Sequence, residues 1–113
     1  MEMAANELPG EITCVRLSGR LDARGAGRID VPFTASVAAV GRSAAIDLSG
    51  VTFIASMGIR LLISTARSLS LKGSKMVLFG AQPLVRNVLE EAAIDQIIPL
   101  VATQEQALDV LVR

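Results

Sequence analysis

The chain has 113 residues, of which eleven are basic and eleven acidic, and it contains no histidine, tryptophan or tyrosine. The balanced charge and the lack of Trp and Tyr argue against a nucleic-acid-binding protein, which usually carries a basic surplus and stacking side chains. The lack of histidine excludes Ser-His-Asp catalysis and most zinc sites, and the length suits one domain, over residues 1–113, with a single core.

The hydropathy pattern indicates a protein that does not insert into membranes. No apolar run approaches the roughly 20 residues that a membrane-spanning helix needs. The start, MEMAANE, is acidic, whereas a secretory signal has a basic start followed by a long apolar segment. We therefore expect a cytoplasmic protein. Cys14 is the one cysteine and lies in the apolar run ITCVRL, so we expect a buried structural thiol.

The first part of the chain predicts two strands and a connection. Extended pieces at about 3–8 and 11–18 flank Pro9-Gly10, a dipeptide typical of turns. The next residues, 19–22, read GRLD and are expected to connect the second strand to a helical segment.

Residues 23–40 predict an interrupted helix. Apolar residues recur there at helical spacing, namely Ile29, Phe33, Val37 and Val40. Pro32 lies inside this pattern and removes a backbone donor. We expect a kinked helix or two pieces, with the better-formed piece running from Pro32 to Val40 and ending at Gly41, and with Pro32 on the surface.

The middle of the chain predicts a strand, a turn and an amphipathic helix. Residues 44–48 form an apolar run that ends at a turn signal, Ser49-Gly50. Residues 56–71 place apolar side chains on one helical face. Ser56, at the start of this helix, has two possible uses. It can cap exposed backbone N–H groups, or it can present a hydroxyl where negative charge, including a phosphate, is favoured.

The last part of the chain predicts two further strand–helix units. The expected elements are a strand at 75–79, a helix that opens at Pro83, a strand at 97–101 and a helix at 104–112. In the helix after Pro83, the residues placed on the apolar face are Leu84, Val85, Val88, Leu89 and Ala92. Thr103 and Gln106 have the spacing of a capping box at the start of the last helix.

Strands that alternate with helices indicate an α/β fold with parallel pairing and right-handed crossovers. We expect a central mixed β-sheet of about five strands with about four helices, in which the amino-terminal hairpin supplies an antiparallel edge. Sites in such sheets form beyond the carboxyl ends of the strands. Residues 19–24, 54–58 and 80–83 should meet there.

These passages bring Asp22 and Ser56 toward one edge, but they do not predict an enzyme. An aspartate is a poor base for a serine hydroxyl, and no general acid accompanies the pair. The phosphate loop GxxxxGK[ST] is absent, and the acidic residues lack calcium-loop spacing. We expect neither a cofactor nor a metal. Of the arginines that follow Cys14, Arg20 and Arg24 could reach the rim and recognise an acidic partner surface or a phosphate.

The order of motifs resembles one family. GRLD at 19–22, DLSGVTFIASMG at 47–58, a helix, and a strand ending in Phe79-Gly80 are similar to STAS domains, specifically the stand-alone anti-sigma factor antagonists. The resemblance covers about residues 15–111. It implies a partner that is both an anti-sigma factor and a serine kinase of the histidine-kinase-like ATPase type, with a serine phosphatase that resets the cycle.

The resemblance also implies the site residues. Family members are phosphorylated on a Ser or Thr in the motif D-[ST]-[ST]-G, which here reads Ala55-Ser56-Met57-Gly58. The hydroxyl usually phosphorylated is replaced by Met57, and the motif aspartate by Ala55. Either Ser56 accepts the phosphate, or the domain binds its partner constitutively. The residues expected to bind the partner are Asp22, Ala55, Ser56, Met57, Gly58 and Arg60. Asp22 is either the family's aspartate near the phosphosite or a loop-capping carboxylate.

Two further functions stay open at this point. Some stand-alone STAS domains resemble accessory subunits of lipid transporters, where they support an ATPase and undergo no regulatory cycle. The other possibility is nucleotide binding by the domain itself, which no phosphate-cradling glycine loop supports.

Overall fold

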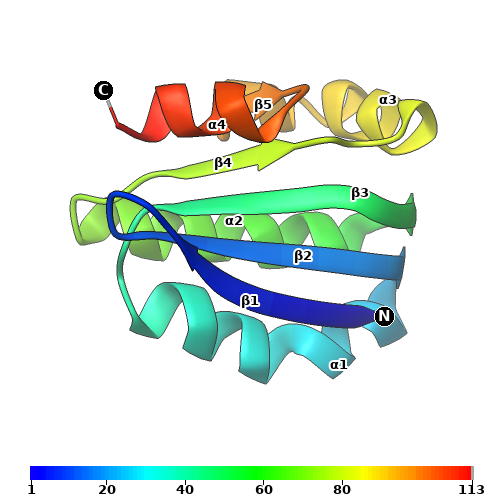
Figure 1. Ribbon diagram of the computed structural model, residues 1–113. Helices are drawn as coiled ribbons and strands as arrows, with labels where there is room; N and C mark the ends of the chain where they lie inside the picture. Colours follow the sequence, from blue (N-terminus) through cyan, green and yellow to red (C-terminus); the bar gives the residue numbers. More distant parts are fainter. Residues whose placement is uncertain (113) are drawn as a thin grey trace.

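The computed structural model describes residues 1–112, in which five strands form one mixed sheet in the order β1-β2-β3-β4-β5 (Figure 1). The strands are β1 (Glu2–Leu8), β2 (Ile12–Leu21), β3 (Ala44–Ile54), β4 (Met76–Phe79) and β5 (Leu100–Val101). β1 is antiparallel to β2, and every other neighbouring pair is parallel. The predicted α/β class and the antiparallel edge are confirmed.

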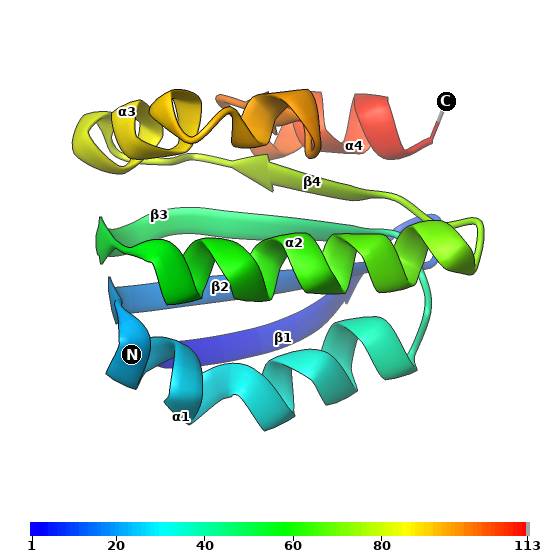
Figure 2. The ribbon, with the colours of Figure 1, turned by 180° about the vertical axis from the view of Figure 1, so that it is seen from behind.

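The helices cover both faces of the sheet. They are α1 (Ala23–Thr34), α2 (Ser56–Leu71), α3 (Pro83–Glu91) and α4 (Gln104–Leu111), with a π-helical turn η1 (Ala35–Ala39) and a 3-10 turn η2 (Ile94–Gln96). α1 and α2 lie side by side over one face (Figure 2), and α4 covers β3 and β4 on the other.

The core follows the alternation of side chains along the strands. In β2, Val15 and Leu17 point into the larger cluster under α1 and α2, whereas Cys14 points into a smaller cluster under α4. Cys14 is buried, as predicted. Burial raises the pKa of its thiol, and the carboxylate of Asp47 is a second, smaller cause.

The first helix differs from the prediction. α1 begins already at Ala23, continues through Pro32 and passes directly into η1. The better-formed piece is therefore the one before Pro32, because Asp22 caps its start and Ile29 is buried against the sheet. Pro32 is exposed, as expected, and the helical run ends before Gly41, whose backbone is left-handed with φ +76°.

The predicted turn at Ser49-Gly50 is wrong, because β3 runs through it. β3 carries an extra residue relative to β2 at two places, and Gly50 pairs with Ser18 beside the first of them. A Cβ at Gly50 would lie 2.5 Å from Ser18 Oγ. The glycine thus marks a bulge with a close strand approach, not a chain reversal. Residues 19–21 were predicted to lie in a connection, but they belong to β2, because they pair with the part of β3 that follows Gly50.

Two details of the last third also differ from the prediction. Val85 and Leu89 are buried, but Leu84 is 76% exposed and Val88 and Ala92 are also exposed, because the short α3 turns only a narrow face to the core. The strand predicted at 97–101 shrinks to Leu100–Val101, since η2 occupies the residues before it. The capping box of Thr103 and Gln106 is confirmed.

Candidate functional site

The candidate site lies at the edge where β2, β3 and β4 end, on the right of Figure 1. Because these strands are parallel, the residues that follow them meet at one rim. The backbone N–H of Ala55 donates to the carbonyl of Leu21 at 3.1 Å. Asp22 follows Leu21 and Ser56 follows Ala55, so this hydrogen bond brings the two predicted site residues to the same place. Gln82 donates through Nε2 to the carbonyl of Ser49 at 2.9 Å, which ties the start of α3 to the same rim.

Gly58 sets how closely α2 approaches β2. A Cβ at this position would lie 2.6 Å from both the side chain and the carbonyl oxygen of Leu21. Real Cβ atoms do not come so close, so only glycine fits here. The start of α2, with Ser56 and Met57, is thereby held against the end of β2.

Ser56 is the first residue of α2 and is exposed. The N-cap is Ala55, which has no side-chain oxygen, so capping, one of the two uses left open for Ser56, is not the role of its hydroxyl in this structure. The first intrahelical bond runs from the N–H of Ile59 to the carbonyl of Ala55. Within residues 1–112, the Ser56 hydroxyl has no hydrogen-bond partner. The helix start therefore combines unpaired N–H groups with a free hydroxyl.

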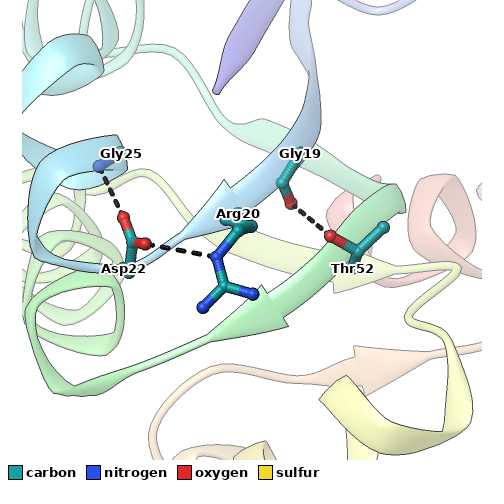
Figure 3. A network of polar contacts seen from close by, with 5 residues as sticks. All are labelled: Gly19, Arg20, Asp22, Gly25 and Thr52. Carbon is teal, nitrogen blue, oxygen red and sulfur yellow. Dashed lines mark hydrogen bonds and ion pairs between the residues drawn. The ribbon is translucent and has the colours of Figure 1, made fainter.

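Asp22 is the N-cap of α1 and the centre of a small polar network (Figure 3). Its Oδ1 accepts from the N–H of Gly25 at 2.8 Å, and its Oδ2 lies 3.4 Å from Arg20 Nε. The hydrogen bond from Gly25, with a smaller contribution from Arg20, lowers the pKa of this carboxyl. Of the two uses predicted for Asp22, the structure contains the capping one.

The rim also carries an exposed aromatic contact that the sequence analysis missed. The guanidinium of Arg20 lies 4.2 Å from the centre of the Phe53 ring, and Phe53 is 40% exposed. Met57, one of the residues expected to bind the partner, is 47% exposed. Alternation along β3 would place Phe53 inside, next to exposed Thr52. The second bulge breaks this alternation and exposes Phe53, so the sequence alone gives no signal for the contact.

Beside the rim, a groove of about 630 Å³ runs between α1 and α2. It begins at Met57 and passes Arg60 on the α2 side, while Ala23 and Gly27 line the α1 side. The sequence does not predict this groove, because the interruption expected within residues 23–40 concealed the small residues that recur along the start of α1.

Two further kinds of site bear on what the described residues can do, a metal centre and a membrane span. Within residues 1–112, no group of three or more metal-ligating side chains lies close enough to hold an ion. In that same part of the chain, no helix combines the length and the hydropathy needed to cross a membrane.

Solved structures share this fold over nearly the whole chain. An anti-sigma factor antagonist from Mycobacterium paratuberculosis is 25% identical, with a TM-score of 0.88, 99% of this chain covered and 94% of that one. An anti-sigma-factor antagonist (STAS) domain protein from Planctomyces limnophilus is 24% identical, with a TM-score of 0.87 and 98% of each chain covered. The Bacillus cell fate determinant SpoIIAA in its phosphorylated form is 22% identical, with a TM-score of 0.72, 99% of this chain covered and 100% of that one.

A family model gives the same assignment from the sequence side. The STAS domain model matches residues 3–107, which include β2 to β5, all of β1 except Glu2, the rim with Asp22 and Ser56, and the groove beside it. The chain belongs to the STAS domain family.

Proposed function

We propose that this chain is an anti-sigma factor antagonist that binds an anti-sigma factor with serine kinase activity through the rim. Phosphorylation of Ser56 by that kinase would end the binding, and a serine phosphatase would restore it. The observation that carries the proposal is the position of Ser56. Its hydroxyl is exposed and unpaired within the described residues, at the start of a helix whose N-cap, Ala55, offers no side-chain acceptor.

The phosphate would be tolerated by the fold and harmful to the interface. Phosphorylation adds about two negative charges and bulk. The unpaired N–H groups and the dipole of α2, a helix of 16 residues, favour negative charge at this end, so the domain keeps its structure. A partner seated on the rim would meet the new charge directly and would dissociate.

The residues around Ser56 are suited to a protein partner. Phe53 and Met57 present adaptable apolar surface to a partner. Ala55 is half-buried between them, and Gly58 is buried and contributes indirectly, because it holds the start of α2 against Leu21. Asp22 supplies a charged edge to this surface, although its carboxylate is already bound to the start of α1. Arg60 lies one turn beyond Ser56 on α2 and is exposed.

The motif of this chain leaves one candidate acceptor. In the family pattern the hydroxyl just before the glycine receives the phosphate, and Met57 has none to offer. Ser56 is the remaining hydroxyl in the four-residue motif. SpoIIAA, which has been solved in a phosphorylated form, supports a cycle of this kind for a chain of the same fold.

The test is incubation of the purified protein with its cognate kinase and ATP, followed by intact mass measurement. The wild type should gain one phosphate and Ser56→Ala none. Thr52→Ala is the matched control, because Thr52 is an exposed hydroxyl four residues earlier, and it should be labelled like the wild type. Labelling that persists in Ser56→Ala would remove Ser56 from the proposal. A wild type that binds the kinase without being labelled would indicate constitutive binding.

A further inference from the structure

The groove between α1 and α2 has a floor of small residues. Ala23, Ala26 and Gly27 line it on α1, at spacings that place them on one helical face. A Cβ at Gly27 would have no heavy atom within 4 Å, so the groove is open above this residue. Small residues on a helix face allow another element to approach the backbone closely.

The α2 side of the groove is apolar and basic. Leu61 and Ile63 contribute apolar surface, and Arg60 and Arg67 stand seven residues apart on the same side. None of the ion pairs within residues 1–112 involves either arginine. Asp30 is the one carboxylate in the lining, and it accepts a hydrogen bond from the Thr34 hydroxyl at 3.3 Å. The lining therefore carries an excess of positive charge along α2.

The length of the groove corresponds to a short helix. Met57 at one end and Arg67 at the other are ten residues apart, which corresponds to about 15 Å along a helix axis. A helix laid between two others packs its ridges of side chains into the grooves between the side-chain ridges of both. Carboxylates seven residues apart on that helix would face Arg60 and Arg67, since both helices have the same rise per residue.

From this match we infer that the groove is the docking site for an amphipathic helix of the partner. That helix presents apolar side chains to the floor and Asp or Glu, at i and i+7, to Arg60 and Arg67. The inference rests on the proposed function, because it takes the anti-sigma kinase to be the protein that supplies this helix. It extends the interface from the rim to three turns along α2.

The same geometry couples the groove to Ser56. Ser56 and Arg60 stand four residues apart on α2, within reach of each other on the helix surface. A phosphate on Ser56 would pair with Arg60. It would lie at the end of the groove that Met57 lines. It would withdraw one arginine from the acidic helix and repel the carboxylates of that helix.

A groove-filling substitution tests the docking site. Gly27→Leu adds a side chain into open space and replaces a glycine inside a helix, so the fold should be kept or stabilised. The matched control is Ala35→Leu, an exposed position further along the same helical run and outside the groove lining. By calorimetry with the unphosphorylated protein and its cognate kinase, Gly27→Leu should raise the Kd about tenfold or more, and Ala35→Leu should leave it unchanged.

A charge reversal tests the chemistry of the partner. Arg60→Glu with Arg67→Glu should weaken kinase binding about tenfold or more, because like charges would face each other across the groove. Arg16→Glu with Arg28→Glu makes the same change in net charge at two exposed positions outside the groove and should have little effect. This pair of variants also covers the case in which Gly27→Leu does not fold.

The outcomes separate the two proposals. A wild type that binds no kinase overturns the proposed function and the docking helix with it. A wild type that binds, with Gly27→Leu and the Arg60/Arg67 reversal unchanged, overturns the groove alone and leaves the rim as the whole interface. Loss of binding in both variants, with both controls intact, supports the groove.

Discussion

At the scale of single residues, the site depends on a few positions with a defined structural role. Gly58 is the clearest, because any Cβ there would overlap Leu21. Asp22 is the second, because its carboxylate both caps α1 and pairs with Arg20 at the rim. The first of these residues sets the position of Ser56, and the second holds the neighbouring chain segment in place.

Gly58→Ala is expected to destabilise the protein by about 1–3 kcal/mol, the usual cost of forcing extra bulk into a packed site. The contact that must give is partly the Leu21 carbonyl, which is backbone and cannot rotate away. Gly27→Ala is the matched control, since a Cβ there meets nothing and should stabilise the helix by about 0.5–1 kcal/mol. Urea unfolding measures both. Equal stability of the two variants would contradict the close packing of α2 on β2.

Asp22 gives a prediction for pH. Its pKa is lowered in the folded state, chiefly by the hydrogen bond from Gly25. The charged carboxylate of Asp22 therefore contributes its full stabilisation of the fold when the pH is above the ordinary aspartate pKa of about 3.9. This contribution is lost as the pH falls through the lower pKa of the folded state. Asp22→Asn keeps an oxygen for the cap but has no charge to lose. The wild type should melt above this variant at neutral pH, and the gap should close in acid.

Thermal melts of both proteins between about pH 7 and about pH 2.5 span this range. Asp22→Ala, which loses the cap altogether, should melt below Asp22→Asn throughout. A gap between wild type and Asp22→Asn that is constant over the whole range would show that the charge of Asp22 contributes nothing to folding.

At the scale of elements, α1 is the part that local sequence rules describe least well. Pro32 lies on the exposed side of α1, so the proline ring does not enter the core. The helix continues through Pro32 although this residue has no backbone N–H to donate. The helical run then widens into the π-helical turn η1 and ends before Gly41. Burial of Ile29 and Phe33 against the sheet outweighs the cost of the proline.

Pro32→Ala is expected to stabilise the protein by about 1–2 kcal/mol, because it restores a backbone donor inside the helix at the cost of a more flexible unfolded chain. The position is exposed, so no packing changes should offset the gain. Chemical denaturation of the variant and the wild type measures the difference. A loss of stability would mean that the proline holds the geometry of the α1–η1 junction.

Sequence reasoning succeeds here wherever a signal is local. The capping box at Thr103, the hairpin at Pro9-Gly10 and the buried strand at 76–79 all rest on neighbouring residues. It fails at Ser49-Gly50, because a glycine in a bulge and a glycine in a turn look alike in sequence and only the pairing with Ser18 distinguishes them. Leu84 was predicted on the apolar face of its helix but is exposed, because helical periodicity does not show how much of that face the rest of the protein covers.

At the scale of the whole molecule, the parallel sheet determines which residues meet. Asp22 and the motif 55–58 are far apart in sequence, and their meeting at one rim follows from the strand order, as predicted. The groove could not be predicted in this way, because it depends on the separation of α1 and α2 and on the small residues between them. Met57 belongs to both the motif 55–58 and the groove lining, so a single partner can contact the rim and the groove together. Figure 2 shows α1 and α2, which line this groove, side by side over one face of the sheet.

The central claim is that the state of Ser56 decides whether the partner is bound. The most direct measurement is the mass of the protein purified from its own cells, with fragmentation of the tryptic peptide 43–60 to separate Ser56 from its other hydroxyl residues, Ser43, Ser49 and Thr52. The account predicts a phosphate on Ser56 in part of the population, and none in the fraction that co-purifies with the kinase. Protein unmodified under every growth condition, or phosphate on Ser43, Ser49 or Thr52 instead, would contradict it.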